Sequence, residues 1–352
     1  MSKGRSSPLA LHQPATVQRV LLAIVIGLAA AAMHYFSAAR NGSLSDFSIL
    51  WFGGKLLGSG ANPYALIGPQ QTIDLPSHVF YPAPALVAIM PFTLVPVHFA
   101  GAVFVFASSA LLVFGATRDG WHLIPIFPSV AFMTSARLGQ VSILMCAALF
   151  IPALTFFSVI KPQASIPILG ASRSVREWIL AGAGAVLLAG ASFLLLPDWP
   201  REWLSTLATA DYFRPPIMTL PGIGIALVLL RWRRPEAWLV FLAACLPQTW
   251  YPYNGLILLT VAANYREASA LSLISSFGWL VTYAWFVGEW RAPETRAVMQ
   301  NVLISLGYLP AVIVILRREN GGPGPWWLSW LLLNRKNDQR RQPSAASTAM
   351  SS

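Results

Sequence analysis

The sequence predicts an all-α protein that crosses a membrane many times. Its 352 residues are 56% hydrophobic and only 11% charged, whereas soluble domains carry about 25% charged residues. The mean hydropathy is +0.59, and apolar stretches separated by short polar breaks recur along the whole chain. We therefore expect a polytopic transmembrane helical bundle of about 10–12 spans.

Several of these apolar stretches are too short for a straight crossing, which requires roughly 20 residues. Three of them are rich in proline: 82–96, 151–170 and 247–255. Such segments are expected to be broken or re-entrant helices, which a membrane tolerates only where protein or a water-filled cavity covers the freed backbone groups. The expected number of spans therefore includes short and broken ones.

The net charge of +11 arises largely from basic residues in short loops. Four such clusters stand out: Arg173 and Arg176, Arg231 to Arg234, Arg317 and Arg318, and Arg335 to Arg341. This is the positive-inside pattern of membrane proteins, and it also favours contact with membrane lipids. Because no basic stripe with base-stacking aromatics lies on a soluble domain, we expect no nucleic-acid partner.

The charge pattern predicts which loops share a side. Four loops are expected in the cytoplasm: 173–177, 231–234, 264–267 and 317–319. Alternation then places four others outside: 39–80, 197–214, 248–254 and 288–296. We expect a multi-pass protein of the cell (plasma or inner) membrane with both termini cytoplasmic. The side on which residues 117–172 lie stays open.

A single membrane domain, residues 17–320, is expected to make up most of the chain. The residues before it, 1–16, are interpreted as a cytoplasmic tail. Together with the apolar run that follows they resemble a signal sequence, but that run is long enough to span and is interpreted as an uncleaved first helix. Residues 321–352 are expected to be an interfacial segment followed by a disordered basic tail.

The outer loop 39–80 contains the acid on which the functional interpretation depends, Asp46. Residues Leu44 to Leu57 are apolar and aromatic with polar breaks, which favours a helix lying in the membrane interface. A partly desolvated carboxylate there could accept a proton from an attacking hydroxyl. The alternative is that Ser45 or Asp46 merely caps a helix that begins at Phe47.

Polar groups at the end of the same loop are candidates for substrate binding. They are Asn62, Tyr64, His78 and Tyr81. The alternative is a turn that starts a helix, with tyrosines at the membrane interface, because proline is comfortable at a helix start.

Later in the chain, Arg137, Gln140 and Lys161 place cations and an amide between apolar runs. Charges in such positions are expensive and often functional, and either cation could hold a phosphate. The alternative is snorkelling of the long side chains to the interface. On the outward side, Tyr253 and Asn254 could line a sugar site, or belong to an aromatic belt.

Five short motifs follow one another along the chain: Asp46-Phe47, Gly60-Ala-Asn-Pro-Tyr64, Phe80-Tyr-Pro-Ala-Pro84, Gly139-Gln140 and Lys161-Pro162. Their order resembles that of the membrane-embedded C-type glycosyltransferases. Within these it is similar to glycosyltransferase family 87, which includes the polyprenol-phosphate-mannose-dependent mannosyltransferases. The resemblance covers about residues 15–320 and implies a helical membrane bundle with interfacial helices in its first outer loop.

The resemblance also implies an activity. The donor would be a polyprenyl-phosphate-linked sugar, with mannose the first choice, and the acceptor a hydroxyl of a glycolipid or glycan. Asp46 would be the general base at the outer face, and transfer would invert the anomeric centre. Lys161 and Arg137 are the first candidates to bind the departing phosphate, with Arg214 in reserve.

Other classes of function remain as alternatives. A transporter or lipid flippase would explain broken helices, but it predicts inverted repeats, and none is visible in the sequence. A non-catalytic scaffold would predict no cavity at Asp46. The chain contains no Walker loop, HExxH, CxxC pair or GxSxG elbow, and we expect neither a cofactor nor a metal.

Overall fold

The computed structural model describes residues 14–41, 45–210, 214–249, 252–285, 293–322 and 324–328. The C-terminal tail expected from Arg335 onward, most of the N-terminal tail and much of the loop 288–296 lie outside these residues. Regular structure in the described part is helical, apart from two short strands that pair in parallel. The all-α class is confirmed.

The first half of the chain contains these elements: α1 (Thr16–Asn41), α2 (Asp46–Gly58), α3 (Pro63–Leu66), β1 (Ile67–Gly68), β2 (Ile73–Asp74), α4 (Ala83–Ile89), η1 (Met90–Leu94), α5 (Val97–Ala116), η2 (Ile124–Ile126), α6 (Val130–Leu138), α7 (Ser142–Ala148), η3 (Pro152–Ile160) and α8 (Pro162–Gly170).

The second half contains α9 (Val175–Leu195), α10 (Trp199–Ala208), η4 (Pro216–Met218), η5 (Pro221–Arg231), α11 (Pro235–Cys245), η6 (Pro252–Gly255), α12 (Leu256–Leu259), α13 (Tyr265–Trp285), α14 (Pro293–Leu303), η7 (Ile304–Tyr308) and α15 (Leu309–Leu316).

Four helices in the described residues are long and apolar enough to cross a membrane. They are Thr16–Arg40, Val97–Ala116, Val175–Leu195 and Thr295–Leu316. Three shorter apolar helices accompany them, at Ala83–Leu94, Pro221–Arg231 and Pro235–Cys245. A membrane protein is thus supported, but four long helices are fewer than the 10–12 spans expected. Prolines divide the remaining apolar runs into short helices, as the run 151–170 illustrates by splitting into η3 and α8.

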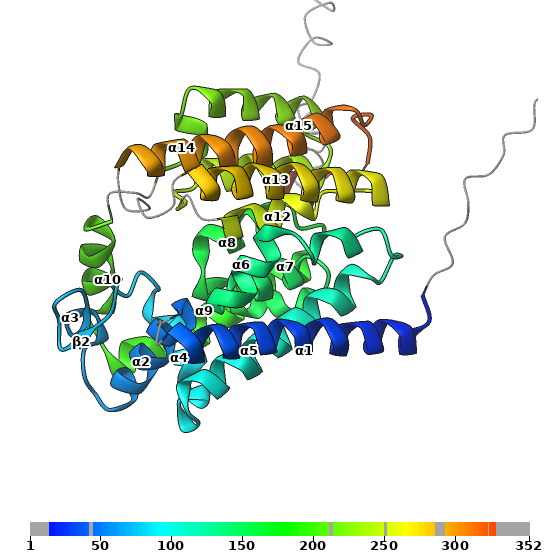
Figure 1. The fold of residues 1–352 in the computed structure, drawn as a ribbon. Coiled ribbons are helices and arrows are strands. Elements are labelled where there is room, and N and C mark those ends of the chain that lie inside the picture. The colour runs from blue at the N-terminus through cyan, green and yellow to red at the C-terminus, as the bar shows by residue number, and fades with distance from the viewer. Residues whose placement is uncertain are drawn as a thin grey trace, which may run out of the picture.

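Helices that are far apart in the sequence pack against one another. α1 lies along α5 (Figure 1), where Gly27 allows Phe106 to approach to 3.0 Å from where a Cβ would stand. α13 runs beside α14 on the far side of the molecule from α1 (Figure 1). α6, α7 and α8 lie between these layers, and most of α7 is buried.

The helix expected in the membrane interface, α2, is instead part of the core. Phe47, Leu50 and Leu57 are completely buried, and the helix packs against α4, η1 and α5. Gly53 permits this packing, because a Cβ there would lie 2.8 Å from a methyl group of Leu86 in α4. α2 is therefore buried more deeply than a helix lying on a surface.

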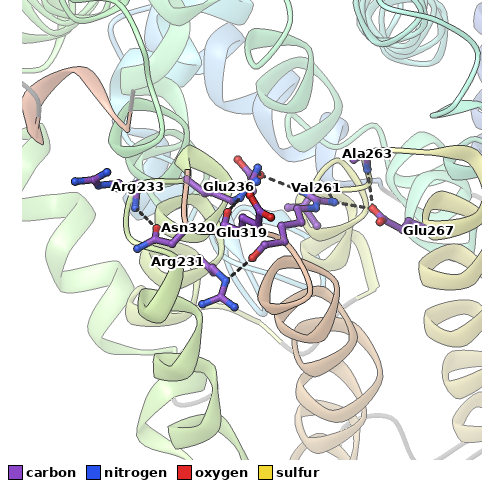
Figure 2. A network of polar contacts seen from close by, with 10 residues as sticks. Arg231, Arg233, Glu236, Val261, Ala263, Glu267, Glu319 and Asn320 are labelled. Atoms are coloured by element: carbon purple, nitrogen blue, oxygen red, sulfur yellow. Dashed lines mark hydrogen bonds and ion pairs between the residues drawn. The ribbon is translucent and has the colours of Figure 1, made fainter. Parts of the chain in front are cut away.

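Three of the loops expected in the cytoplasm meet around Arg318, whose partners Glu236, Val261 and Glu267 are labelled in Figure 2. Its guanidinium lies 3.0 Å from the Glu236 carboxylate and 2.6 Å from the Glu267 carboxylate. It also donates to the backbone oxygen of Val261 at 2.8 Å. Arg231 donates to backbone oxygens of Leu316 and Arg318, which satisfies carbonyls at the end of α15. One arginine thus joins three loops that are distant in sequence.

Replacing Arg318 by methionine should destabilise the bundle by about 1–3 kcal/mol, because two partly buried carboxylates lose their partner. Thermal unfolding of the purified protein measures this. The matched control is Arg317→Met, since Arg317 is the exposed neighbour. Equal stability of the two variants would contradict a joining role for Arg318.

This contribution should depend on pH. Burial raises the pKa of Glu267, but the Ala263 amide together with the hydrogen bond and charge of Arg318 outweighs burial and lowers the pKa overall. A lowered folded-state pKa means stability that is present at neutral pH and lost as the pH falls through that pKa. The difference between Arg318→Met and the unchanged protein should therefore shrink in acid.

Loops expected on the outer side also meet. The indole of Trp203 in α10 donates to the Phe80 backbone oxygen at 3.0 Å, and Arg214 pairs with Gln248 through an antiparallel bridge. In Figure 1 α10 and α3 lie where α1 ends, whereas the C-terminal end of α15 lies on the side where α1 begins. The predicted grouping of the loops agrees with these contacts, while their assignment to outside and cytoplasm stays a prediction.

Candidate active site

Asp46 is the first residue of α2, and its side chain does not cap the helix. The cap is Ser45, whose hydroxyl accepts from the Ser48 amide at 3.3 Å while the Ser48 hydroxyl accepts from the Ser45 amide at 3.3 Å. This reciprocal arrangement is a capping box. Of the two capping alternatives, the structure selects Ser45, which leaves the half-buried Asp46 carboxylate available for another role.

Lys161 lies at the break between η3 and α8. Because a residue before proline is forced out of the helical region, Pro162 holds Lys161 at φ −145° and ψ 76°. The Lys161 side chain is 4% exposed. Its ammonium donates to Gln140 Oε1 and to Ser142 Oγ, both at 2.8 Å. The alternative of snorkelling is therefore wrong for Lys161, which points into the protein.

Two tyrosines complete the surroundings of this ammonium. The Tyr81 hydroxyl donates to Gln140 Oε1 at 3.2 Å, and the ammonium lies 5.9 Å from the Tyr81 ring centroid. It lies 5.1 Å from the Tyr253 centroid. Both distances suit a cation–π interaction. We call Tyr81, Gln140, Ser142, Lys161 and Tyr253 the lysine cluster.

The charges of Asp46 and Lys161 act on each other. Burial raises the pKa of the Asp46 carboxyl, and the charge of Lys161 opposes that rise. Burial likewise lowers the pKa of Lys161, and the charge of Asp46 opposes that fall. Burial, with the Asp46 charge as a further cause, raises the pKa of Tyr81. Asp46 therefore lies within electrostatic reach of the lysine cluster, and the Tyr81 hydroxyl keeps its proton.

Gly139 allows the connection between α6 and α7 to pass close to the start of α2. Its φ of +66° ends α6 in a left-handed conformation. A Cβ at this position would lie 2.6 Å from the Phe47 Cβ and 3.0 Å from the His34 ring. The Gly139-Gln140 pair thus combines a close backbone approach to Phe47 with a side chain that accepts from Lys161.

Gly139→Ala should therefore loosen the packing of the Gly139-Gln140 turn against Phe47 and His34. The left-handed conformation costs about 1–2 kcal/mol for alanine, and overpacking against Phe47 adds about 1–3 kcal/mol. Thermal unfolding measures the loss. Gly190→Ala is the control, since a Cβ there meets nothing within 4 Å. Equal melting temperatures for the two variants would contradict this account.

Asn62 and Tyr64 support the site without belonging to the lysine cluster. The Asn62 side chain caps α3 by accepting from the Tyr64 amide at 3.0 Å. The buried Tyr64 hydroxyl donates to the backbone oxygen of Tyr81 at 3.0 Å. The Asn-Pro-Tyr motif therefore forms a capped turn whose tyrosine holds the backbone of Tyr81.

Three other predicted residues have different surroundings. His78 packs edge-on to Phe80, with ring centroids 6.2 Å apart. The side chain of Arg137 is exposed and makes no hydrogen bond or ion pair in the described residues, although its backbone oxygen lies 3.0 Å from His34 Nδ1. The role of Arg137 in binding the departing phosphate stays a prediction. Asn254 donates to the Thr249 backbone and hydroxyl, both at 2.7 Å.

Arg214 also has an exposed side chain. Its backbone pairs with Gln248, and Gln248 lines a small cavity beside Lys161. Arg214 is therefore linked to the cavity beside Lys161 through its backbone pairing with Gln248.

That cavity brings in residues that sequence reasoning missed. Its volume is about 30 Å³, and its lining includes Ser142, Lys161, Gln248, Tyr253 and Asn254. This is room for a water molecule. Gln248 is 7% exposed and its Oε1 has no hydrogen-bond partner in the described residues. Ser142 could have been found two residues after Gln140, and Gln248 begins the same outer loop, 248–254, as the predicted Tyr253 and Asn254.

The chemistry available here is that of an acid, an ammonium and neutral hydrogen-bonding groups. Within the described residues, no group of three or more His, Cys, Asp or Glu side chains could hold a metal ion.

Comparisons with models of protein families, with curated proteins and with solved structures find no match for this chain.

Proposed function

We propose that this protein is a membrane glycosyltransferase that moves a hexose, with mannose the first choice, from a polyprenyl-phosphate carrier to a hydroxyl acceptor. The observation that carries the proposal is the buried Lys161 ammonium, bound at 2.8 Å to Gln140 and Ser142 and close to the Tyr81 and Tyr253 rings, whose charge also acts on the Asp46 carboxyl. Four motifs that are distant in sequence supply the groups concerned. These are the charged Asp46 and Lys161, together with Tyr81 and Gln140. The resemblance to glycosyltransferase family 87 rests on the same motifs and on their order along the chain.

In the proposed reaction Asp46 accepts the proton of the acceptor hydroxyl. The hydroxyl oxygen then attacks the anomeric carbon from the side opposite the lipid phosphate. As the new bond forms, the bond from the anomeric carbon to the phosphate oxygen breaks with its electron pair, and the configuration inverts. Lys161 is placed to offset the negative charge that the phosphate gains.

The site must open for this reaction. A cavity of about 30 Å³ has room for a water molecule, but not for a hexose. Donor binding therefore requires side chains around Lys161 to move, and Tyr253 and Gln248 line the space that would widen.

The direct test supplies a membrane preparation of the full chain with a radiolabelled polyprenyl-phosphate hexose and an extract of glycolipid acceptors. Formation of a labelled glycolipid, with release of polyprenyl phosphate, is expected. A parallel reaction with a nucleotide sugar should give no product. Labelled lipid that crosses the membrane without sugar transfer would instead favour the flippase alternative and contradict this proposal.

A transporter is less well supported than a transferase. Lys161 lies where proline breaks the run 151–170, and interrupted helices also form transporter sites. Transporters of that kind are built from inverted repeats, however, and none is visible in the sequence.

A further inference from the structure

The bundle holds a second cavity at its arginine-bearing end, far in sequence from Asp46. Its volume is about 270 Å³, and it lies where α8 and α12 end and where α9 and α11 begin. Its polar lining residues are Ser172, Arg173, Glu177, Glu236 and Thr260. The proposed transferase reaction uses none of them.

This cavity contains one cation and one carboxylate that are free to bind a ligand. Glu236 is paired with Arg234 and Arg318. Arg173 is exposed and Glu177 is half-buried, and in the described residues neither side chain has a hydrogen-bond or ion-pair partner. The open groups therefore have opposite charges, which suits a ligand that also carries both.

An apolar groove of about 230 Å³ is lined from three helices that also line the cavity. Its lining residues are Ile166, Leu169, Gly170, Trp178, Leu242 and Trp327. Consecutive residues line one space each: Ile168 and Leu169 on α8, and Glu177 and Trp178 on α9. On α11, Glu236 lines the cavity and Leu242 the groove, six residues or about 9 Å apart along the helix. A polar space and an apolar one are thus built on the same helices.

Tryptophans mark this end as a membrane boundary. The rings of Trp238 and Trp327 lie edge-on at 4.8 Å, and the Trp327 indole donates to the Gly170 backbone oxygen at 2.9 Å. Tryptophan gathers where lipid meets water, and arginine-rich loops gather on the same cytoplasmic boundary.

We propose that the cavity and groove together bind one phospholipid with a phosphoethanolamine headgroup. Arg173 holds the phosphate, Glu177 holds the ammonium, and the first part of an acyl chain lies in the groove beside Trp178. The cavity of about 270 Å³ equals about nine water volumes, which gives room for the eight non-hydrogen atoms of phosphoethanolamine. A purely anionic headgroup would face Glu177 without a compensating charge, and choline has no N–H to donate to it.

The test is lipid competition on the full-length protein. The protein is reconstituted in nanodiscs with equal amounts of phosphatidylethanolamine, phosphatidylglycerol and phosphatidylcholine, and the lipid it retains is measured by native mass spectrometry. Phosphatidylethanolamine should be retained about tenfold above the other two, as expected for one charge-assisted hydrogen bond. Glu177→Gln should remove that preference. Arg173→Gln should lower retention of all three lipids, because all three carry the phosphate, and Trp178→Ala should do the same.

The control is Arg176→Gln. Arg176 is an exposed cation on α9, the helix that carries Glu177, and it does not line the cavity. It should retain the preference. Equal retention of phosphatidylglycerol would mean simple attraction to basic loops and would overturn the proposal. So would an equal loss in Arg176→Gln, or no preference in the unchanged protein. If Arg173→Gln fails to fold, Glu177→Gln alone decides.

Discussion

Asp46→Asn should lower the rate of sugar transfer by about 10²- to 10⁴-fold, the usual contribution of a positioned general base. Asparagine has the size of aspartate but cannot accept the proton of the acceptor hydroxyl. The fold should survive, because Ser45 and Ser48 cap α2 without help from Asp46. The measurement is product formation at saturating donor, together with a melting curve for each protein.

The matched control for this variant is Asp74→Asn. Asp74 lies in the same long loop, is exposed, and accepts from the Gln70 amide at 3.0 Å. This control should keep full activity. If Asp46→Asn retained more than a tenth of the activity, or lost activity only together with its folded state, Asp46 would not be the base.

The lysine cluster can be partly predicted from residue chemistry. Charges beside apolar runs are costly, so an acid and a lysine in such positions point to a function from the amino-acid sequence alone. Asp46 and Lys161 are both identified in this way, and the Lys161-Pro162 order also predicts the break that turns the lysine inward. Arg137 is identified in the same way, but its side chain is exposed, and which way the last turn of α6 faces could not be predicted from the sequence.

The contribution of Gly139 could not have been predicted from the sequence. Its importance arises from its left-handed conformation and its contact with Phe47, and both depend on how α6 packs against α2. The expected 10–12 spans, which include short and broken ones, stay a prediction beside the four described helices that are long enough to cross. A hydrophobic run indicates an apolar environment, but protein interior and lipid are equally apolar. The run 140–158 illustrates this, since α7 is mostly buried among other helices and Pro152 begins a separate helix after it.

Lys161→Gln should lower transfer about 10²- to 10³-fold, as expected when one charged group that stabilises a leaving group is removed. It should also change the pH dependence. The charge of Lys161 holds down the pKa of Asp46, which burial raises. Without that charge the pKa of Asp46 rises further, so a higher pH is needed to ionise the base. The acidic limb of the pH–rate profile should therefore move to higher pH.

The basic limb of the pH–rate profile provides a second, independent test of the role of Lys161. Burial lowers the pKa of Lys161, so in the unchanged protein activity should fall at high pH as this ammonium loses its proton. That limb should vanish in Lys161→Gln, and Lys161→Arg should restore part of the rate with the acidic limb back near its original position. Lys55→Gln is the control, because Lys55 is an exposed lysine 4.9 Å from the Trp51 ring. A merely structural lysine would lower the melting temperature and leave both limbs in place, and that result would separate Lys161 from the chemistry of Asp46.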